Sequence, residues 1–297
     1  MPPVDAVTTG RGLVTVVIVN YNGGEVILRC LAALQEQQFR DFQTIVVDNQ
    51  STDGSLAAIR TQFPSIQVLA LRTNRGFAGG VNHALLGYVQ SPLVALLNPD
   101  AFPDGNWLGN LVAAAAQFPE YAAFGSRMFS DEAMQHLDGV GDVYHISGLP
   151  WREGHGQPDS ERYDQIKEIF APCAAAALYR TAALRSIGLF DEDLFLYTED
   201  VDVGFRLRLA GHRCLYVPTA RIWHVGSAIV GKHSDFQIYH GHRNLVWVFV
   251  KNMPAIPLCL FLLLHIGLNF VSLVWFSLRG KSGPIFRAKR DALLGIR

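Results

Sequence analysis

Apolar residues follow two alternating patterns over the first hundred positions. Short continuous runs rich in β-branched residues are typical of strands that are buried on both faces of a parallel sheet, and they occupy residues 13–19, 44–47, 67–71 and 93–97. Apolar residues at helical spacing fill the stretches between them, at 25–38, 51–63 and 79–89. This alternation predicts an α/β fold in which a mostly parallel, Rossmann-like central sheet carries helices on both faces.

Polar residues gather where the predicted strands end, in the clusters Asn20-Tyr21-Asn22, Asp48-Asn49, Asn74-Arg75-Gly76 and Asn98-Pro99-Asp100. Ligands of open α/β sheets bind beyond the carboxyl ends of the strands. We therefore expect Asp48 and Asp100 to open into one crevice, where one carboxylate is suited to a nucleobase and the other to a divalent cation that bridges a diphosphate. For a lone carboxylate at a strand end, a turn or a helix cap is the alternative.

The pattern is looser after residue 102. A helix is predicted at 107–117, and the Gly-, Pro- and His-rich stretch 139–158 is expected to form loops that face an acceptor. Residues 199–211 have the form of a helix, with acidic residues at the start and Gly211 just past the end.

The composition excludes several classes of protein. The 297 residues include 25 Lys and Arg against 26 Asp and Glu, which leaves no excess of charge to neutralise a nucleic-acid backbone. The four cysteines are widely spaced, which argues against a disulfide scaffold or a structural zinc site. The glycines at 76–80 lack the GxGxxG spacing of nicotinamide and flavin enzymes. Residues 1–12 lack the pattern of a secretory signal, so we expect a loose N-terminus and a cytosolic catalytic region.

A family resemblance rests on six motifs in order along the chain: VTVVIVNYN, VVDNQSTDGS, NRGFAGGVNHAL, LLNPDAFPDGNWL, GLFDEDLFLYTEDVDVGFRLRLAG and WHVGSA. Together they resemble the family 2 glycosyltransferases of GT-A fold, and within them the rhamnosyltransferase-like branch that builds bacterial cell-surface polysaccharides. The resemblance covers residues 13–250 and implies a nucleotide-binding half at 13–105 and an acceptor-binding half at 106–250. Residues 251–297 are then a hydrophobic helical tail.

The resemblance implies roles for the residues at the predicted strand ends. Asn20 and Asn22 would lie in the first nucleotide-binding loop. Asp48 would contact the base, and Arg75 would neighbour the sugar nucleotide.

A metal site is also implied. Asn98-Pro99-Asp100 matches the DxD-type motif of the family, with Asp100 in the last position and Asn98 in place of the first carboxylate. His224 of WHVGSA matches the downstream histidine that commonly completes the site, although a histidine by itself is more often structural. The implied cofactor is Mg²⁺ or Mn²⁺. Asp104 is a spare acid, for which a helix cap is the favoured interpretation.

Glu199-Asp200 matches the ED pair of the family, in which the Asp acts as general base. A sugar hydroxyl must lose its proton as it attacks the anomeric carbon, and a carboxylate within hydrogen-bond reach accepts that proton. One carboxylate without an obvious nucleophile favours a single displacement with inversion. An ordinary acidic helix start is the alternative, and Asp202 is expected to stabilise that first turn.

The apolar residues 255–278 contain no charge and are long enough to span a bilayer. Basic residues flank them: Arg243 and Lys251 before, and Arg279, Lys281, Arg287, Lys289 and Arg290 after. The positive-inside bias places the second basic flank in the cytosol, and the nucleotide-sugar site before the helix must also be cytosolic. A helix that crosses the membrane once cannot have both of its ends in the cytosol. We therefore expect an in-plane or re-entrant helix, broken near Pro254, Pro257 or Gly267, that docks the enzyme on the cytoplasmic face of the inner (plasma) membrane.

Two alternatives for this tail stay open. In one, the apolar helix packs in a homodimer interface; in the other, it spans the membrane. His240, His242 and Arg243 resemble the segment of the family near the diphosphate, but a basic flank to a membrane helix explains them equally well.

The sequence thus predicts an inverting glycosyltransferase that moves a sugar, with rhamnose suggested by the branch, from a nucleotide diphosphate-sugar to a hydroxyl of a lipid-linked or polysaccharide acceptor. One alternative is a sugar-nucleotide nucleotidyltransferase, which would normally hold a triphosphate with a basic residue after the first strand, and NYNGG has none. The other is a non-catalytic nucleotide-sugar-binding membrane protein.

Overall fold

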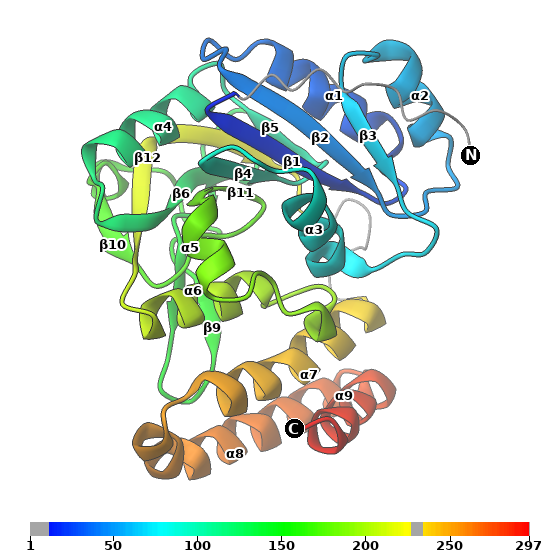
Figure 1. Ribbon diagram of the computed structural model, residues 1–297. Helices are drawn as coiled ribbons and strands as arrows, with labels where there is room; N and C mark the ends of the chain where they lie inside the picture. The colour runs from blue at the N-terminus through cyan, green and yellow to red at the C-terminus, as the bar shows by residue number, and fades with distance from the viewer. Residues whose placement is uncertain (1–11, 227–233, 297) are drawn as a thin grey trace.

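A computed structural model describes residues 12–226 and 234–296 of the chain. A large sheet domain fills the upper part of Figure 1, and three C-terminal helices form a layer beneath it. Most of the expected loose N-terminus, residues 1–12, and the last two residues of the WHVGSA motif lie outside the described residues.

The first half of the chain forms the parallel part of the sheet. Its strands lie in the order β4-β1-β2-β3, and all neighbours are parallel: β1 (Val14–Asn20), β2 (Phe42–Asp48), β3 (Gln67–Ala70) and β4 (Leu93–Leu97). The helices between them are α1 (Gly24–Gln35), α2 (Ser55–Gln62) and α3 (Gly76–Gly87). Because β1 and β2 pair Asn20 with Asp48 at their last residues, these two polar ends reach the same edge of the sheet.

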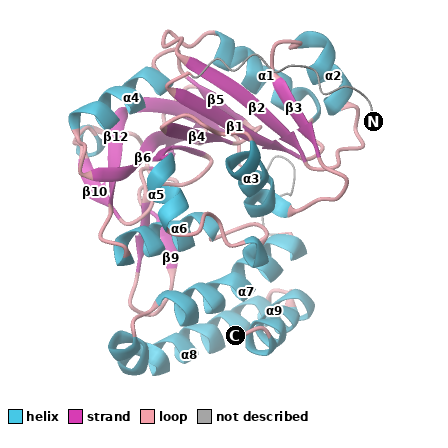
Figure 2. Ribbon diagram, in the orientation of Figure 1, coloured by secondary structure: helices cyan, strands magenta, loops and turns pink. Residues whose placement is uncertain are grey.

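Apolar side chains pack on both faces of the sheet, as the pattern predicts. Val16 and Ile18 of β1 belong to the layer that includes α1 and α4 (Trp107–Gln117), whereas Val17 belongs to the layer with α3, α5 (Thr181–Ser186) and α6 (Glu199–Leu209). Figure 2 shows these helices on either side of the strands.

The second half extends the sheet with strands of mixed direction. Outward from β4 the order is β11 (Ala176–Arg180), β6 (Tyr121–Phe129), β12 (Arg213–His224) and β10 (Lys167–Ile169). β11 is antiparallel to β4 and to β6, whereas β12 is parallel to β6. The predicted parallel order therefore holds for the first four strands. The change at β11 was not visible in the sequence because the period of a buried apolar run does not encode strand direction.

Short elements complete the sheet domain: β5 (Ala101–Pro103), β7 (Leu137–Gly139), β8 (Asp142–Tyr144), β9 (Pro150–Arg152), and the 3-10 turns η1 (Glu161–Tyr163) and η2 (Glu192–Leu194). β5 pairs with the end of β12, so that His224 lies opposite Ala101. The stretch expected to form acceptor-facing loops contains the β8–β9 hairpin, which descends toward the helical layer in Figure 1.

The helical layer consists of α7 (Asp235–Asn252), α8 (Ala255–Leu278) and α9 (Ser282–Leu294). α8 is one continuous helix, so the expected break at Pro257 or Gly267 is wrong; only Pro254 interrupts the chain, between α7 and α8. Pro257 lies in the first turn of α8, where a missing N–H costs no helical hydrogen bond. Among the described residues α8 alone is long and apolar enough to cross a membrane, and only 6% of its most apolar stretch is buried.

Candidate functional site

The first polar cluster closes around Asn20 at the end of β1. The buried Nδ2 of Asn20 donates to Oδ1 of Asp48 at 3.0 Å and to the hydroxyls of Ser51 and Ser55 at 3.1 and 2.9 Å. Oδ2 of Asp48 accepts the Ser51 N–H at 3.1 Å. The structure thus brings two predicted nucleotide-loop residues together. Because Asp48 is only 1% exposed, it shapes the loop from within, and its contact with a base stays a prediction.

Asn22 and Arg75 each contact a residue next to this cluster. Oδ1 of Asn22 accepts the Thr52 N–H at 2.8 Å, and the Arg75 N–H donates to Oδ1 of Asn49 at 3.0 Å. The guanidinium of Arg75 pairs with Glu192 at 2.6 Å, and both side chains are about 40% exposed. Because exposed ion pairs contribute little to stability, Arg75 is able to exchange Glu192 for an anionic ligand.

Asp100 and His224 meet at the carboxyl end of the sheet. The β5–β12 pairing sets them side by side, and Val225 donates its N–H to the Asp100 carbonyl at 3.1 Å. Nε2 of His224 lies 3.4 Å from Oδ1 of Asp100, and both side chains are more than 90% buried. Asn98 precedes them at the end of β4, where its carbonyl accepts the Ala101 N–H at 3.1 Å.

A carboxylate that the sequence analysis did not single out, Asp138, holds the other nitrogen of His224. Its Oδ2 lies 2.8 Å from Nδ1 of His224 and 2.5 Å from Nη1 of Arg152. Burial alone would raise the pKa of Asp138, but Arg152, His155 and His224 together hold it well below its usual range. Burial alone would lower the pKa of His224, but Asp100 and Asp138 raise it to about 9.

This arrangement fits a divalent cation. Nε2 of His224 is buried without a hydrogen-bond partner among the described residues, and it lies 3.4 Å from the Asp100 carboxylate, a distance that two ligands of one ion can share. A second carboxylate on Nδ1 is the arrangement that orients metal-binding histidines. The described part of the chain contains no group of three or more His, Cys, Asp or Glu with metal-site geometry, so further ligands would come from substrate oxygens or water.

Glu199 and Asp200 begin α6, beside a third acid, Asp142. Burial, followed by the charge of Asp200, raises the pKa of Glu199 well above its usual range, and the same two causes raise the pKa of Asp142 to about 8. Asp200 is half-buried, and its oxygens accept the N–H groups of Val201 at 2.9 Å and Ala174 at 3.3 Å. Arg152 joins Asp142 to Asp138, since its Nε lies 3.8 Å from the Asp142 carboxylate and its Nη1 lies 2.5 Å from that of Asp138.

Asp202 lies in the first turn of α6, and its stabilisation of that turn stays a prediction. It is fully buried and contacts Arg206 at 2.7 Å, Lys251 at 2.6 Å and Nδ2 of Asn252 at 2.7 Å. A buried carboxylate needs such partners to offset its desolvation, so Asp202 joins α6 to the end of α7.

His240, His242 and Arg243, which are close in the sequence, contact different parts of the structure. The ring of His240 stacks 5.3 Å from that of Phe195, beside the loop that leads to α6. His242 instead faces Phe276 of α8 and Lys289 of α9, inside the helical layer. Arg243 donates to the carbonyls of Asp193 and Leu194.

Asp104 forms a turn before α4 and is not its N-cap, which is Asn106. Its Oδ1 accepts the Asn106 N–H at 3.0 Å, directly before α4.

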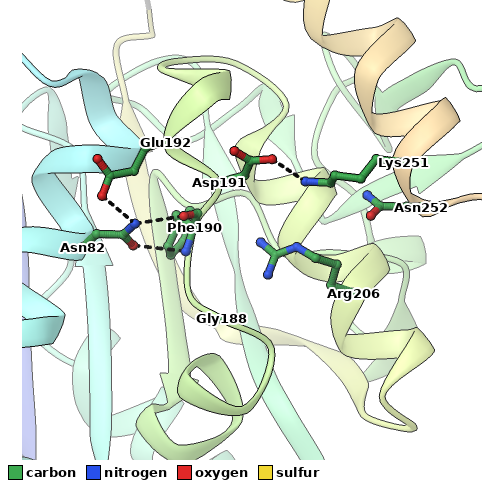
Figure 3. Close-up of a pocket in the computed structure, with 8 residues that line it drawn as sticks. All are labelled: Asn82, Gly188, Phe190, Asp191, Glu192, Arg206, Lys251 and Asn252. Atoms are coloured by element: carbon green, nitrogen blue, oxygen red, sulfur yellow. Dashed lines mark hydrogen bonds and ion pairs between the residues drawn. The ribbon is translucent and has the colours of Figure 1, made fainter. Parts of the chain in front are cut away.

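A pocket of about 590 Å³ lies where η2, α3, α6 and α7 meet (Figure 3). Lys251 pairs with Asp191 at 2.6 Å, and Nδ2 of Asn82 donates to the Phe190 carbonyl at 2.8 Å. The lining residues contain no predicted site residue. Because its charges largely pair with one another, this pocket has the character of a junction between the sheet domain and α7.

The sequence analysis missed Asp138 and Asp142 and gave Arg152 no role beyond its loop. The signal was present as the sequence DGVGD at 138–142, in which two acids border a turn. Nothing local, however, distinguishes such acids from ordinary loop residues. Their function depends on β12 and α6, which lie about 60 or more residues further along the chain.

Comparison with known proteins identifies relatives by sequence and by fold. The model of the family described as Glycosyl transferase family 2 matches residues 15–188. An N-acetylglucosaminyl-diphospho-decaprenol L-rhamnosyltransferase of Mycobacterium tuberculosis is 26% identical over 260 residues, which cover 80% of this chain and 83% of that protein. The Myxococcus xanthus O-antigen biosynthesis protein RfbC is 27% identical over 71% of this chain, but the match covers only 17% of its own length.

Solved glycosyltransferases share the fold. A mannosyltransferase from Pyrobaculum calidifontis, in complex with GDP-Man and Mn²⁺, superposes on 97% of this chain and 76% of its own with a TM-score of 0.59 and 19% identity. A TarS fragment from S. aureus with UDP-GlcNAc covers 96% of this chain and 81% of its own, with a TM-score of 0.61 and 19% identity. The expected GT-A fold is confirmed.

Proposed function

This chain belongs to glycosyl transferase family 2, and from that premise we propose that it transfers a sugar from a nucleotide diphosphate-sugar to a hydroxyl of a lipid-linked acceptor, with inversion at the anomeric carbon. One observation carries the proposal. A half-buried carboxylate, Asp200, lies in the first turn of α6 near Asp142, whose pKa its charge raises, and Asp142 contacts Arg152, which pairs with Asp138 beside the Asp100–His224 pair. This arrangement supports a base and a diphosphate site in one region.

In the proposed reaction the acceptor oxygen attacks the anomeric carbon as the bond from that carbon to the diphosphate breaks. Asp200 takes the proton of the hydroxyl, and its two N–H contacts hold it in place for that transfer. Burial and the charge of Asp200 raise the pKa values of Glu199 and Asp142, which favours Asp200 over these two neighbours as the base. Without a second carboxylate in the role of nucleophile, the single displacement inverts the anomeric centre.

Asp100 and His224 are proposed to hold Mg²⁺ or Mn²⁺, with Asp138 orienting His224. When bound there, a divalent cation offsets the negative charge that grows on the leaving diphosphate. The exposed Arg75 is placed to contact the same sugar nucleotide, and the loop built by Asn20, Asn22 and Asp48, with Asn98 at the next strand end, would form its binding surface.

The proposed acceptor and location are supported by α8 and by the relatives. The mycobacterial relative is named for a sugar linked by a diphosphate to decaprenol, and α8 presents an uncharged, exposed surface suited to a lipid bilayer. We propose that α8 docks the enzyme in the plane of the cytoplasmic leaflet of the inner membrane. A homodimer that covers α8 is the competing arrangement. Rhamnose is the proposed sugar because of the same relative.

Replacing Asp200 tests the function. Asp200→Asn should abolish transfer to a polyprenyl diphosphate-linked sugar, because the amide accepts no proton, while calorimetry shows that the variant still binds the nucleotide sugar. Asp41→Asn, which changes an exposed carboxylate at the opposite end of β2, is the control and should keep wild-type turnover. Near-wild-type turnover of Asp200→Asn would overturn the role of Asp200.

The same assay separates the other classes. Wild-type protein that binds nucleotide sugars but transfers to no acceptor of the panel would point to a non-catalytic protein. Release of pyrophosphate from a nucleoside triphosphate and a sugar phosphate would point to a nucleotidyltransferase. Either result would contradict the proposed transfer.

A further inference from the structure

The segment that leads into α6 has an unfavourable backbone. Phe195, Tyr197 and Thr198 have φ angles of +65°, +71° and +62°, in the left-handed region that side chains other than glycine rarely adopt. Thr198 is the N-cap of α6, yet its side chain makes no capping hydrogen bond. Glu199 and Asp200 follow directly. Contacts from outside the segment must therefore hold this conformation.

Asn244 of α7 supplies those contacts. The side chain is fully buried, and its Nδ2 lies 2.8 Å from the carbonyl oxygen of Leu194, 3.0 Å from that of Leu196 and 2.8 Å from that of Tyr197. One amide group thus gathers three carbonyls of the left-handed turn. A polar group this deeply buried is held strongly to its partners, because losing them leaves it unsatisfied.

Arg243 fixes the orientation of that amide. Its Nε donates to Oδ1 of Asn244 at 3.0 Å, so that Nδ2 faces the turn. Its Nη2 donates to the Asp193 carbonyl at 2.8 Å and to the Leu194 carbonyl at 3.2 Å. The two neighbouring residues of α7 therefore hold the backbone from 193 to 197, directly before the proposed base.

A second link joins α7 to the other side of the same helix start. Asp202, two residues after Asp200, is bound by Lys251 and Asn252 at the end of α7. The first turn of α6 is thus held to α7 both before and after Asp200.

We propose that Asn244 is a positioning residue for sugar transfer, which sets the direction of Asp200 by holding the left-handed turn 194–198. This inference rests on the proposed role of Asp200 as base. A side chain that served stability alone would change the free energy of unfolding and leave the turnover of the folded enzyme unchanged. The two roles therefore predict different kinetics.

The test compares Asn244→Ala with a matched control. Arg180, at the end of β11, also gathers three carbonyls, those of Tyr121, Ala115 and Phe118, but it lies opposite Leu93 at the far end of β4 from Asn98. Arg180→Met should therefore destabilise the chain without touching the site.

The expected result is a split between kcat and KM in Asn244→Ala. A base displaced by about an ångström lowers kcat by at least ~30-fold, whereas KM for the nucleotide sugar stays within about threefold. Arg180→Met should keep kcat within about twofold of wild type. Amide hydrogen exchange of residues 195–201 should quicken in Asn244→Ala and not in Arg180→Met. If Asn244→Ala does not fold, Asn244→Ser, which restores one donor, takes its place with the same expectations.

Two results would overturn the inference: a folded Asn244 variant with wild-type kcat, or one whose loss lies only in KM for the nucleotide sugar. Asp200→Asn keeps this outcome separate from the proposed function. If Asp200→Asn is inactive and Asn244→Ala is not, the base assignment stands and the positioning role fails. If Asp200→Asn is active, the base assignment itself fails.

Discussion

Some residues of the candidate site lie in a recognisable sequence motif, whereas others can be identified only from their contacts in the structure. Asp100, His224 and Asp200 each lie in a short motif that follows a strand or begins a helix, so the sequence predicts their importance. Asp138 and Asn244 act only through contacts with β12 and with the turn 194–198, and no spacing in the sequence expresses such contacts. The structure therefore adds the contacts around residues that the sequence singles out, and the roles proposed for both groups rest on the experiments above.

Asp138 gives the prediction at this scale. Asp138→Asn removes the charge that holds Nδ1 of His224, so metal affinity should fall about tenfold to a hundredfold, as measured by calorimetry with Mn²⁺ on the full chain. Asp164→Asn, which changes a carboxylate that pairs with Arg127 instead, should bind Mn²⁺ as the wild type does. Equal affinity in the two variants would show that Asp138 does not support a metal ligand.

The elements of the sheet were easier to predict than those of the helical layer. Buried β-branched runs and amphipathic helices gave the strands and helices up to β4. The β8–β9 hairpin was expected only as a loop, because its short strands carry no clear alternation. What fixes it is a tertiary contact: Nδ1 of His265, on α8, donates to the Ser147 carbonyl at 2.7 Å, and the His265 ring stacks on Phe249 of α7.

Gly148 makes the close approach of this hairpin testable. Its φ is +85°, and a Cβ there would lie 2.7 Å from both His265 and Phe249, whereas Gly156, with φ of +73°, has no atom within 4 Å of such a Cβ. Gly156→Ala should cost about 1 kcal/mol of unfolding free energy for its backbone alone. Gly148→Ala should cost at least ~1 kcal/mol more, because the two rings must move. Urea unfolding measures the free energy of unfolding of both variants. Equal losses would show that His265 and Phe249 move aside from the new Cβ without an energetic cost.

At the scale of the whole molecule, hydrophobic residues make up 49% of the chain; part of them lies in the buried strands of the sheet, and part is concentrated in α8. The sequence located this helix and its basic flanks. It did not show that α8 is continuous, or that α7 crosses the predicted boundary between residues 250 and 251 and contacts α6. Hydropathy describes how apolar a segment is. The continuity of α8 and the contact of α7 with α6 depend instead on how the segments pack against each other.

Membrane docking is tested on the exposed face of α8. Leu263 is 81% exposed on α8, and Leu86 is 75% exposed on α3 of the sheet domain. Leu263→Lys should weaken binding to vesicles of anionic phospholipid by at least ~10-fold, as measured by cosedimentation, whereas Leu86→Lys should leave it unchanged. If Leu263→Lys instead converts a dimer to a monomer and vesicle binding is unaffected, α8 is a subunit interface.

The junction of α7 with α6 also decides how a detergent-free preparation can be made. Cutting the chain after residue 250 would discard Lys251 and Asn252 and leave the buried Asp202 with Arg206 alone. Cutting after residue 252 would still remove His265 and so release the β8–β9 hairpin. Exchanging the outward-facing leucines of α8 for polar residues keeps both contacts. Under the proposed docking of α8 on lipid, an active detergent-free enzyme is therefore expected from a redesigned surface and not from a shortened chain.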